Sequence, residues 1–452
     1  MAVIESRRKI GIFCHGGTQN LGDEALFAAV IQNVRLRMHS AEIIGFTINP
    51  VDSQRRHGLA CFPIRQAGKI ASSPVLDSSP ASSGASDPSP STLAKLKEFC
   101  KSVPGLKWLV SAVRHSAGAL SAILREPGFL FQSYRRLKGV ELLLVAGSQQ
   151  LNDGYGGVWG FPYTLLKWTV LSKCTGTKIA ILSVGAGPID SPISKFFFRR
   201  VLAWVDYRSY RDAFSSRLVE SIGAKGIHPV FPDLVYSLQF PAPTQAHGSS
   251  NTSPVVVGIN PVPYYDNFYW YSCDPVRYSD YVRKFASFSE WLDKTSHGVL
   301  YFPTQVRADV RTIDDIILAL NGSSKSPNFL RRNTIQTFDD LISEISRADL
   351  VVANRYHGIL ISLILNKPVL AVAYHEKSRA LLAQVGLEEF VVNINDFKTE
   401  ELIERLKALE ANAPVIRTKI AQGMAPLRRA LHAQYDTVLG LIGFKSDTAA
   451  AN

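Results

Sequence analysis

The sequence predicts an α/β protein with two doubly wound domains that face each other across a cleft. Short apolar runs alternate with helix-like patterns on both sides of a polar stretch at residues 241–254, and this alternation is typical of parallel sheets covered by helices. With 452 residues, 46% of them hydrophobic, the chain is long enough for two or three buried cores. Open sheets of this kind bind ligands beyond the carboxyl ends of their strands.

Two stretches of biased composition divide the chain. Residues 71–92 are rich in serine, proline and alanine, so we expect a disordered insertion there. Residues 241–254 have the composition of an interdomain linker. The expected domains are therefore residues 1–240 and 255–442, followed by a disordered tail at 443–452.

The expected strands are apolar runs, and the segments between them carry helix-like periodicity. In the first domain they are residues 9–14, 42–48, 140–147, 178–185 and 207–211, and in the second they are residues 254–260, 298–303, 349–354 and 368–374.

The net charge of +12 predicts an anionic partner, which is a phosphorylated substrate, an acidic membrane surface or nucleic acid. Nucleic acid is disfavoured because the basic residues form no recognised reading motif. No hydrophobic run reaches the ~18 residues of a membrane span, and the first residues pass from a charged stretch into a strand. We therefore expect a cytoplasmic protein.

The five cysteines are far apart and include no CxxC pair, which predicts buried free thiols and neither a disulfide framework nor a zinc site.

Residues 94–138 form a distinct basic block, with nine Lys or Arg against two Glu among many apolar side chains. One interpretation is a peripheral contact with the inner face of an anionic membrane. The other is a helical insertion packed on the first domain.

Two glycine-rich loops follow expected strands. The first, CHGGTQNLGDEAL, offers Asn20, Gly22, Asp23 and Glu24, and we expect Asp23 to cap the next helix, whose N-terminal amides favour an anion or hydroxyls. It matches neither a dinucleotide-binding fingerprint nor a P-loop.

The second loop, AGSQQLNDGYGGVWGFPY, offers the amides of Gln149 and Asn152 among aromatic residues. Amides and aromatic faces suit a sugar, and the alternative is an ordinary long loop. A third loop, at residues 261–275, holds Tyr265 and Trp270 among other aromatic residues. It is either a stacking platform for a sugar or a loop that packs on its own domain.

Basic residues stand at three further strand ends. Arg211 precedes a helix beginning near Asp212, where its planar guanidinium can hold a carboxylate or phosphate, or merely pair with that aspartate. Arg355 and His357 follow an apolar strand and offer a fixed cation beside a titratable acid or base. A histidine alone there would more often be structural.

The third strand end carries His375, Glu376 and Lys377 at another helix start. These residues either hold an anionic ligand or, in the case of Glu376, only favour the helix dipole.

Taken together and in order, these segments resemble the polysaccharide pyruvyl transferase family. The resemblance is carried by GTQNLGDEAL, VELLLVAGSQQLND, YRSYRDAFSSRLV and ADLVVANRYHGILISLILNKPVLAVAYHEKSRALL, of which the last is the most specific. Where the family usually has a run of glycines, this chain has AGSQQ at residues 146–150. The insertion at 71–92 and the basic block are also outside the common pattern.

The resemblance implies a GT-B-like fold of two Rossmann-like domains. It also implies transfer of pyruvate from phosphoenolpyruvate to two hydroxyls of a sugar, as a cyclic ketal, in an exopolysaccharide or its precursor. Arg211 and Arg355 would then hold the donor's two anionic groups, with His375 and Lys377 as further donor contacts. His357 would be the general acid or base.

The family chemistry implies no cofactor, and the sequence contains no cluster that predicts a metal. The acceptor is expected to be a saccharide, lipid-linked if the basic block lies on a membrane. Two alternatives remain at this point. One is a GT-B-type glycosyltransferase using a nucleotide sugar, and the other is a non-catalytic scaffold in polysaccharide assembly.

Overall fold

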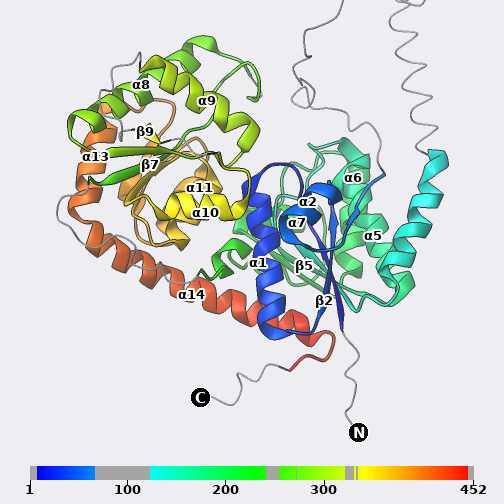
Figure 1. The fold of residues 1–452 in the computed structure, drawn as a ribbon. Coiled ribbons are helices and arrows are strands. Elements are labelled where there is room, and N and C mark those ends of the chain that lie inside the picture. The colour runs from blue at the N-terminus through cyan, green and yellow to red at the C-terminus, as the bar shows by residue number, and fades with distance from the viewer. Residues whose placement is uncertain are drawn as a thin grey trace, which may run out of the picture.

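The computed structural model of the chain describes residues 8–66, 123–240, 254–270, 272–320, 330–331 and 334–445. The expected insertion at 71–92, most of the basic block, nearly all of the linker and most of the tail lie outside these residues. The described residues form two α/β domains with a parallel sheet in each, as the sequence predicts (Figure 1).

The first domain contains a six-stranded sheet in the order β3-β2-β1-β4-β5-β6, with every pair parallel. Its strands are β1 (Lys9–Phe13), β2 (Glu42–Thr47), β3 (Cys61–Pro63), β4 (Leu142–Ala146), β5 (Lys178–Val184) and β6 (Tyr207–Tyr210). The direction of strand addition reverses between β1 and β4, and such a switch point is where open α/β sheets bind ligands. The short edge strand β3 was not among the expected strands.

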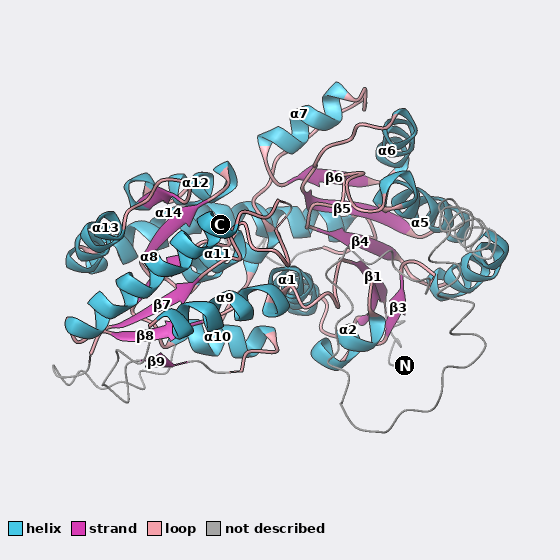
Figure 2. Ribbon diagram, turned by 90° about the horizontal axis from the view of Figure 1, so that it is seen from above, coloured by secondary structure: helices cyan, strands magenta, loops and turns pink. Residues whose placement is uncertain are grey.

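Helices cover both faces of this sheet. They are α1 (Leu21–Arg37), α2 (Pro50–His57), a helix at 123–137, α5 (Phe161–Thr175), α6 (Pro192–Trp204) and α7 (Ala213–Ser221), with the short turns η1 (Gly157–Trp159) and η2 (Leu234–Ser237). Figure 2 shows α1 on the side of the second domain and α5 and α6 on the outer side. The helix at 123–137 is the described end of the basic block, and it packs on the first domain through Glu126, whose carboxylate accepts from Lys167 of α5 at 3.0 Å.

The second domain repeats the architecture with the strand order β12-β11-β10-β7-β8-β9. Its strands are β7 (Val256–Asn260), β8 (Gly298–Tyr301), β9 (Leu330–Arg331), β10 (Leu350–Ala353), β11 (Val369–Ala373) and β12 (Val391–Asn393). Its helices are α8 (Pro275–Lys294), α9 (Val306–Ala319), α10 (Phe338–Ser346), α11 (Tyr356–Ile364), α12 (Glu376–Ala383), η3 (Glu388–Phe390) and α13 (Thr399–Ala411). The central strands are buried along their whole length, as expected for a sheet covered on both faces.

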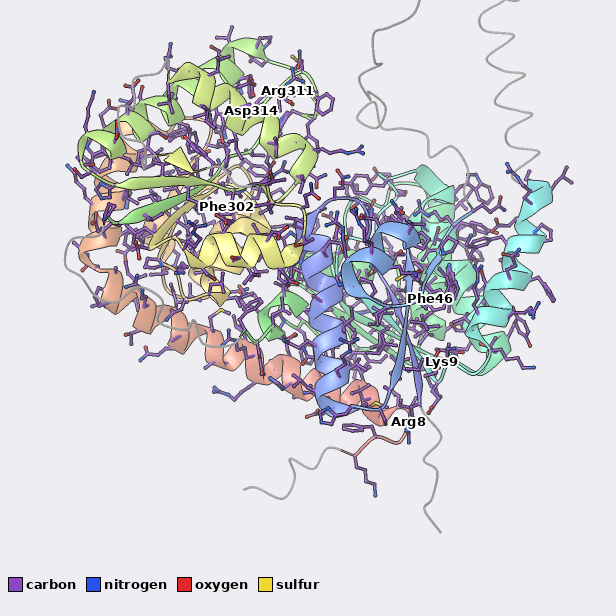
Figure 3. All side chains as sticks on the ribbon, in the orientation of Figure 1. Arg8, Lys9, Phe46, Phe302, Arg311 and Asp314 are labelled. Atoms are coloured by element: carbon purple, nitrogen blue, oxygen red, sulfur yellow. The ribbon has the colours of Figure 1, made fainter. Side chains whose placement is uncertain are left out.

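The last helix, α14 (Ala413–Gly440), joins the two domains (Figure 1). Although the sequence placed residues 255–442 in the second domain, the second half of α14 contacts the first. Asp436 pairs with Arg37 of α1 at 2.6 Å, and Arg8 donates to the carbonyl oxygen of Ile442 beyond the helix end (Figure 3). One apolar core, which includes residues of α1, η2, α10, α11 and α14, therefore continues from one domain into the other.

Within the described residues, no helix combines the length and apolarity needed to cross a bilayer. Of the four described cysteines, Cys14 and Cys61 are buried and free as expected, whereas Cys174 and Cys273 are exposed.

Candidate active site

The loop that follows β1 is fixed to the second domain by backbone pairing. Asn20 and Gln305 form an antiparallel bridge, Leu21 N donates to Thr304 O at 2.9 Å and Val306 N donates to Gln19 O at 3.2 Å. The first glycine-rich loop thus meets the β8–α9 loop, so the carboxyl ends of the two sheets lie next to each other.

Asn20, not Asp23, caps α1. The side-chain oxygen of Asn20 accepts from Gly22 N at 3.0 Å, and its amide group donates to Asp23 Oδ2 at 3.0 Å. The expectation that Asp23 is the cap was wrong because the helix begins two residues before it, at Leu21. Asp23 instead lies buried in the first turn, and its burial raises its pKa to about 6 against the opposing effect of His357.

Glu24 is a loop contact within the first domain. Its carboxylate is fully buried, accepts from Gly17 N at 2.8 Å and meets His57 Nε2 at 2.7 Å. Both oxygens are therefore engaged in holding the glycine-rich loop on α2.

Gly22 brings the first domain against His357 of the second. A Cβ atom at Gly22 would overlap the imidazole ring of His357, so only glycine allows this approach. In the same way, a Cβ at Gly358 would overlap the side-chain oxygen of Asn260 at the end of β7. The NLGDE and RYHG segments therefore contain glycine at positions where any side chain would collide with a neighbouring residue.

His357 has an unsatisfied nitrogen. Its Nε2 is buried and has no hydrogen-bond partner among the described residues. Burial lowers the pKa of His357, while the carboxylates of Asp233 and Asp23 act in the opposite direction and the guanidinium of Arg211 adds to the lowering. The imidazole is therefore mainly neutral near pH 7, and it can accept or relay a proton at a position where no protein group competes for it.

Arg211 reaches into the cleft from the end of β6. Its guanidinium lies 3.4 Å from Asp233 and 3.7 Å from Asp212, and it covers the ring of Tyr356 at 5.2 Å. Only 9% of the side chain is exposed, so the surface Arg–Asp pair considered above does not describe it. Burial alone would lower the pKa of Arg211, but the neighbouring Tyr356, Asp233 and Asp212 outweigh burial and raise it.

Asp212 caps α7 by accepting from Ser215 N at 2.7 Å, as its position after Arg211 suggested.

Arg355 is held by a carboxylate that the sequence did not single out. Its Nε and Nη2 donate to Asp309 Oδ1 at 3.0 and 2.6 Å, and its guanidinium covers the ring of Tyr269 at 5.0 Å. The other oxygen of Asp309 accepts from the backbone of Thr304 and Gln305 at 3.0 and 2.8 Å. Burial would lower the pKa of Arg355, but Asp309 reverses this effect and raises it, so the arginine stays charged.

Lys377 and Gln149 connect the domains at a third place. Lys377 Nζ donates to Gln149 Oε1 at 3.3 Å, and His375 caps α12 by accepting from Lys377 N at 3.2 Å. Burial lowers the pKa of Lys377, and Arg211 lowers it further. The pKa of His375 is also lowered, first by burial and then by the positive charges of Lys377 and Arg211. The side chains of Arg211, His375 and Lys377 are therefore near enough to influence one another.

Three other predicted contact residues, Asn152, Tyr265 and Trp270, contact residues of their own domains. Asn152 is buried, donates to Gln149 O and accepts from Tyr155 N, so it shapes the second loop. Trp270 packs on Tyr265 with ring centroids 5.7 Å apart and on Tyr374 at 5.4 Å. The aromatic loop thus packs on its own domain, and it is Tyr269 that contacts Arg355.

Four residues of the site escaped the sequence analysis: Asp233, Asp309, Tyr356 and Tyr269. Tyr356 was visible between Arg355 and His357. The two aspartates gave no local signal, because their importance lies in partners that are distant in the sequence.

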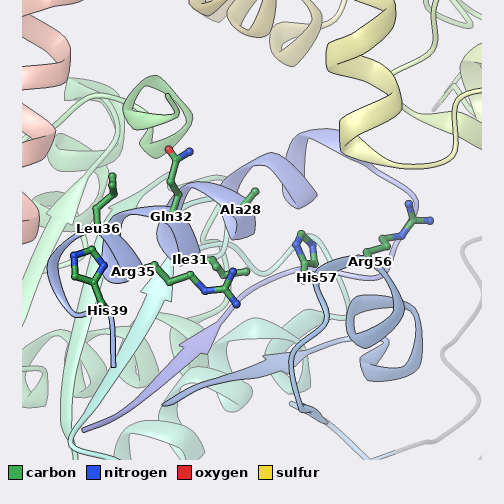
Figure 4. A pocket seen from close by; sticks show the side chains of 8 residues that line it. All are labelled: Ala28, Ile31, Gln32, Arg35, Leu36, His39, Arg56 and His57. Atoms are coloured by element: carbon green, nitrogen blue, oxygen red, sulfur yellow. The ribbon is translucent and has the colours of Figure 1, made fainter. Parts of the chain in front are cut away.

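A pocket of about 460 Å³ lies away from these groups, on the outer side of α1, and includes Arg35, His39 and His57 (Figure 4). His57 lines this pocket and is paired with Glu24. The pocket therefore lies between α1 and the end of α2, and none of Arg211, Arg355 and His357 lines it. Among the described residues, no group of three His, Cys, Asp or Glu side chains is arranged to hold a metal ion.

The two Rossmann-like domains have a GT-B-like fold. The fold is similar to that of S. aureus MnaA in a co-structure with UDP, with a TM-score of 0.52, 10% identity and coverage of 97% of this chain and 99% of that one. It is also similar to that of Anabaena Alr3699/HepE in complex with UDP. The TM-score is 0.51 and the identity 10%, with coverage of 98% of this chain and 100% of that one. A third similar structure is an α,α-trehalose-phosphate synthase (UDP-forming) from Burkholderia vietnamiensis, with a TM-score of 0.51, 13% identity and coverage of 99% of each chain.

The sequence itself identifies the family within this class. The profile of the polysaccharide pyruvyl transferases matches residues 20–376, and the chain belongs to that family. No curated protein matches the sequence.

Proposed function

We propose that the protein transfers pyruvate from phosphoenolpyruvate to two hydroxyls of a sugar, forming a cyclic ketal. The observation that carries this proposal is the pair Arg211 and Arg355, contributed by different domains on the two sides of Tyr356 and His357. Phosphoenolpyruvate has a phosphate and a carboxylate on the same carbon, C2. Two cations fixed by separate carboxylates suit two anionic groups on one small molecule.

Which cation takes which group follows from the surroundings. Arg211 has Lys377 and His375 near it, so this side offers the larger number of hydrogen-bond donors and suits the three free oxygens of the phosphate. Arg355 is held by the single carboxylate of Asp309, and we assign to it the donor's carboxylate. The assignment places C2 beside the free Nε2 of His357.

The reaction needs one proton on carbon and two protons removed from hydroxyls. In the first half, C3 of the donor takes a proton while the electron pair of the C2–C3 double bond forms the new C3–H bond. C2 becomes oxocarbenium-like, and a sugar hydroxyl adds to it and loses its proton. In the second half, the C2–O bond to phosphate breaks and the second hydroxyl closes the ketal. Inorganic phosphate leaves with the remaining proton.

His357 is suited to carry these protons. Arg211 and Arg355 contribute to lowering its pKa, and a bound donor neutralises both of them. The pKa of His357 therefore rises when phosphoenolpyruvate binds, so the imidazole can be the acid toward C3 and then the base toward a hydroxyl. Asp23, across Gly22, stabilises the charged imidazole and acts as a positioning residue.

The test is a thermal-shift titration with phosphoenolpyruvate and, separately, with UDP, because a ligand that binds only the folded state raises the melting temperature. We expect phosphoenolpyruvate to stabilise the wild type by several degrees and not to stabilise Arg355→Ala. His357→Ala should keep donor binding but lose formation of pyruvylated sugar, measured by mass spectrometry. A scaffold would bind without ever forming product.

The UDP arm tests the other enzyme class. Two of the similar structures contain UDP, and a nucleotide-sugar transferase would be stabilised by UDP and not by phosphoenolpyruvate. That result would replace the proposal.

A further inference from the structure

Helix α6 exposes an apolar stripe to solvent. It buries Ser194, Phe198, Val201 and Leu202 against the sheet, yet Ile193, Phe196 and Trp204 on its other side are 54%, 44% and 41% exposed. A surface helix normally presents polar residues on the face opposite its buried one. Large apolar side chains gathered on such a face mark an interaction surface.

Positive charge predominates along the stripe, although Asp190 and Asp153 lie at the start of the helix, where the Asp153 carboxylate accepts from Asp190 N and Ser191 N. Helix α6 contains Lys195, Arg199 and Arg200 and no acidic residue, and the guanidinium of Arg200 covers the ring of Phe196 at 5.2 Å. Together, α5, α6 and the helix at 123–137 contain eight Lys or Arg and a single acidic residue, Glu126. The acidic residue that follows α6, Asp206, is already paired with Lys173 and Lys178.

The apolar surface continues beyond α6. Figure 2 places α5 and α6 on the outer side of the first domain, and Figure 1 shows the helix at 123–137, in cyan, beside α5. The helix at 123–137 exposes Leu124 and Phe131, and Trp159 is exposed on η1, which contacts α6. We call the stripe on α6, together with Trp159, Leu124 and Phe131, the outer face.

We propose that the outer face docks on an anionic lipid bilayer. Aromatic and aliphatic side chains enter the interface between headgroups and acyl chains, and the surrounding lysines and arginines contact anionic headgroups. A second copy of this chain is a poorer occupant, because a symmetric contact would press two strongly positive faces together.

The docking defines the acceptor class, and this step rests on the proposed function. Helix α6 begins directly after the loop that follows β5, at the carboxyl edge of the sheet where Arg211 also stands. The Ile193 end of the stripe is therefore the end nearer the cleft. A saccharide anchored to lipid would be presented beside the cleft opening, whereas a free polysaccharide would gain nothing from this face.

The test is flotation of the full-length protein with phosphatidylglycerol-containing vesicles and with pure phosphatidylcholine vesicles. We expect binding only to the former, weakened by salt. The double variant Phe196→Ser/Trp204→Ser should reduce the partition coefficient at least tenfold, and Arg199→Gln/Arg200→Gln should reduce it roughly 25-fold, at about fivefold for each charge near the surface. The matched control is Val276→Ser/Leu318→Ser, two more exposed apolar residues on α8 and α9, which should bind as the wild type does.

Three outcomes would overturn the proposal. The wild type could fail to float with anionic vesicles, the Phe196→Ser/Trp204→Ser variant could float unchanged, or the wild type could be a dimer that this variant converts to a monomer. Melting temperatures verify that the variants are folded. Flotation needs neither donor nor catalysis, and pyruvylation of a short water-soluble saccharide should be unaffected by the outer-face variants. Failure of docking and failure of the proposed function are thus told apart.

Discussion

His357 is held in place by a residue with no side chain. The ring lies against the Cα of Gly22 from the other domain, and its Nε2 remains unpartnered within the described part of the chain. A buried polar atom without a partner costs about 1–3 kcal/mol. A site that keeps such an atom free has it available for a substrate.

The first prediction concerns this contact. Gly22→Ala places a methyl group inside the imidazole ring, so His357 or the loop must move. We expect at least a 100-fold loss of pyruvyl transfer, because small misplacements of catalytic groups are costly, with a fall of about 1–3 kcal/mol in unfolding free energy from overpacking.

The control for this prediction is Gly440→Ala, where a Cβ meets nothing within 4 Å. Activity and stability should stay at the wild-type level there. If Gly22→Ala retained full activity, the imidazole would not need its present position.

The second prediction concerns the pKa of Asp23. It is raised to about 6 in the folded protein, first by burial, whereas an unfolded aspartate titrates near 3.9. Between these values the folded state binds more protons than the unfolded state, so stability falls as pH rises from about 4 to 6. We expect Asp23→Asn to gain stability relative to the wild type across this window, by up to about 3 kcal/mol before losses in hydrogen bonding.

The measurement is urea unfolding at several pH values, with the exposed Asp396→Asn as control. A pH-independent difference between Asp23→Asn and the wild type would contradict the assigned pKa. Activity should fall in Asp23→Asn, through weaker stabilisation of protonated His357.

At the scale of elements, strand ends and helix starts build the cleft. Arg211 ends β6 before α7, Arg355 separates β10 from α11, and His375 separates β11 from α12. The sequence revealed these positions because strands buried on both faces read as unbroken apolar runs, and polar residues at their ends stand out. The cap at Asn20 was missed because Asn20 and Asp23 are both good capping residues, and local sequence does not separate them.

The partners of the site residues were not predictable for a different reason. Asp309 lies on α9, 46 residues from Arg355, and Asp233 lies 22 residues from Arg211. Their pairing depends on how two sheets and their loops come together. Local pattern carries no information about such contacts.

The third prediction concerns Asp309. Asp309→Ala leaves Arg355 buried without its counter-ion and removes the acceptor of the Thr304 and Gln305 amides. We expect a loss of about 3–5 kcal/mol of unfolding free energy, together with loss of stabilisation by phosphoenolpyruvate. The control is Asp280→Ala, which breaks the surface pairs of Asp280 with Arg283 and Lys284 and should cost under about 1 kcal/mol. Equal effects of the two substitutions would refute the role given to Asp309.

At the scale of the whole molecule, α14 makes the two domains one folding unit. Residues 413–440 were expected in the second domain, because local sequence does not indicate on which domain each half of a helix packs. Tyr435 illustrates the point, since it is fully buried and its ring lies under Arg37 of α1, in the other domain.

The fourth prediction follows from this crossing. Tyr435→Ala removes a large buried side chain between the domains, so we expect a loss of about 3–5 kcal/mol. Val415→Ala, on the exposed side of the first half of α14, should change stability by less than about 0.5 kcal/mol. Calorimetry should show one transition for the wild type. Two separate transitions in the wild type would mean that the domains unfold independently.

The backbone pairing of Asn20 with Gln305 has a mechanical consequence. Together with α14 and the shared apolar core, which also join the two domains, this pairing makes a pivot for a rotation of one domain on the other. Gly22 and His357 lie at the pivot and would keep their contact throughout. Gln149 and Lys377, whose contact also joins the two domains, would separate first in such a rotation.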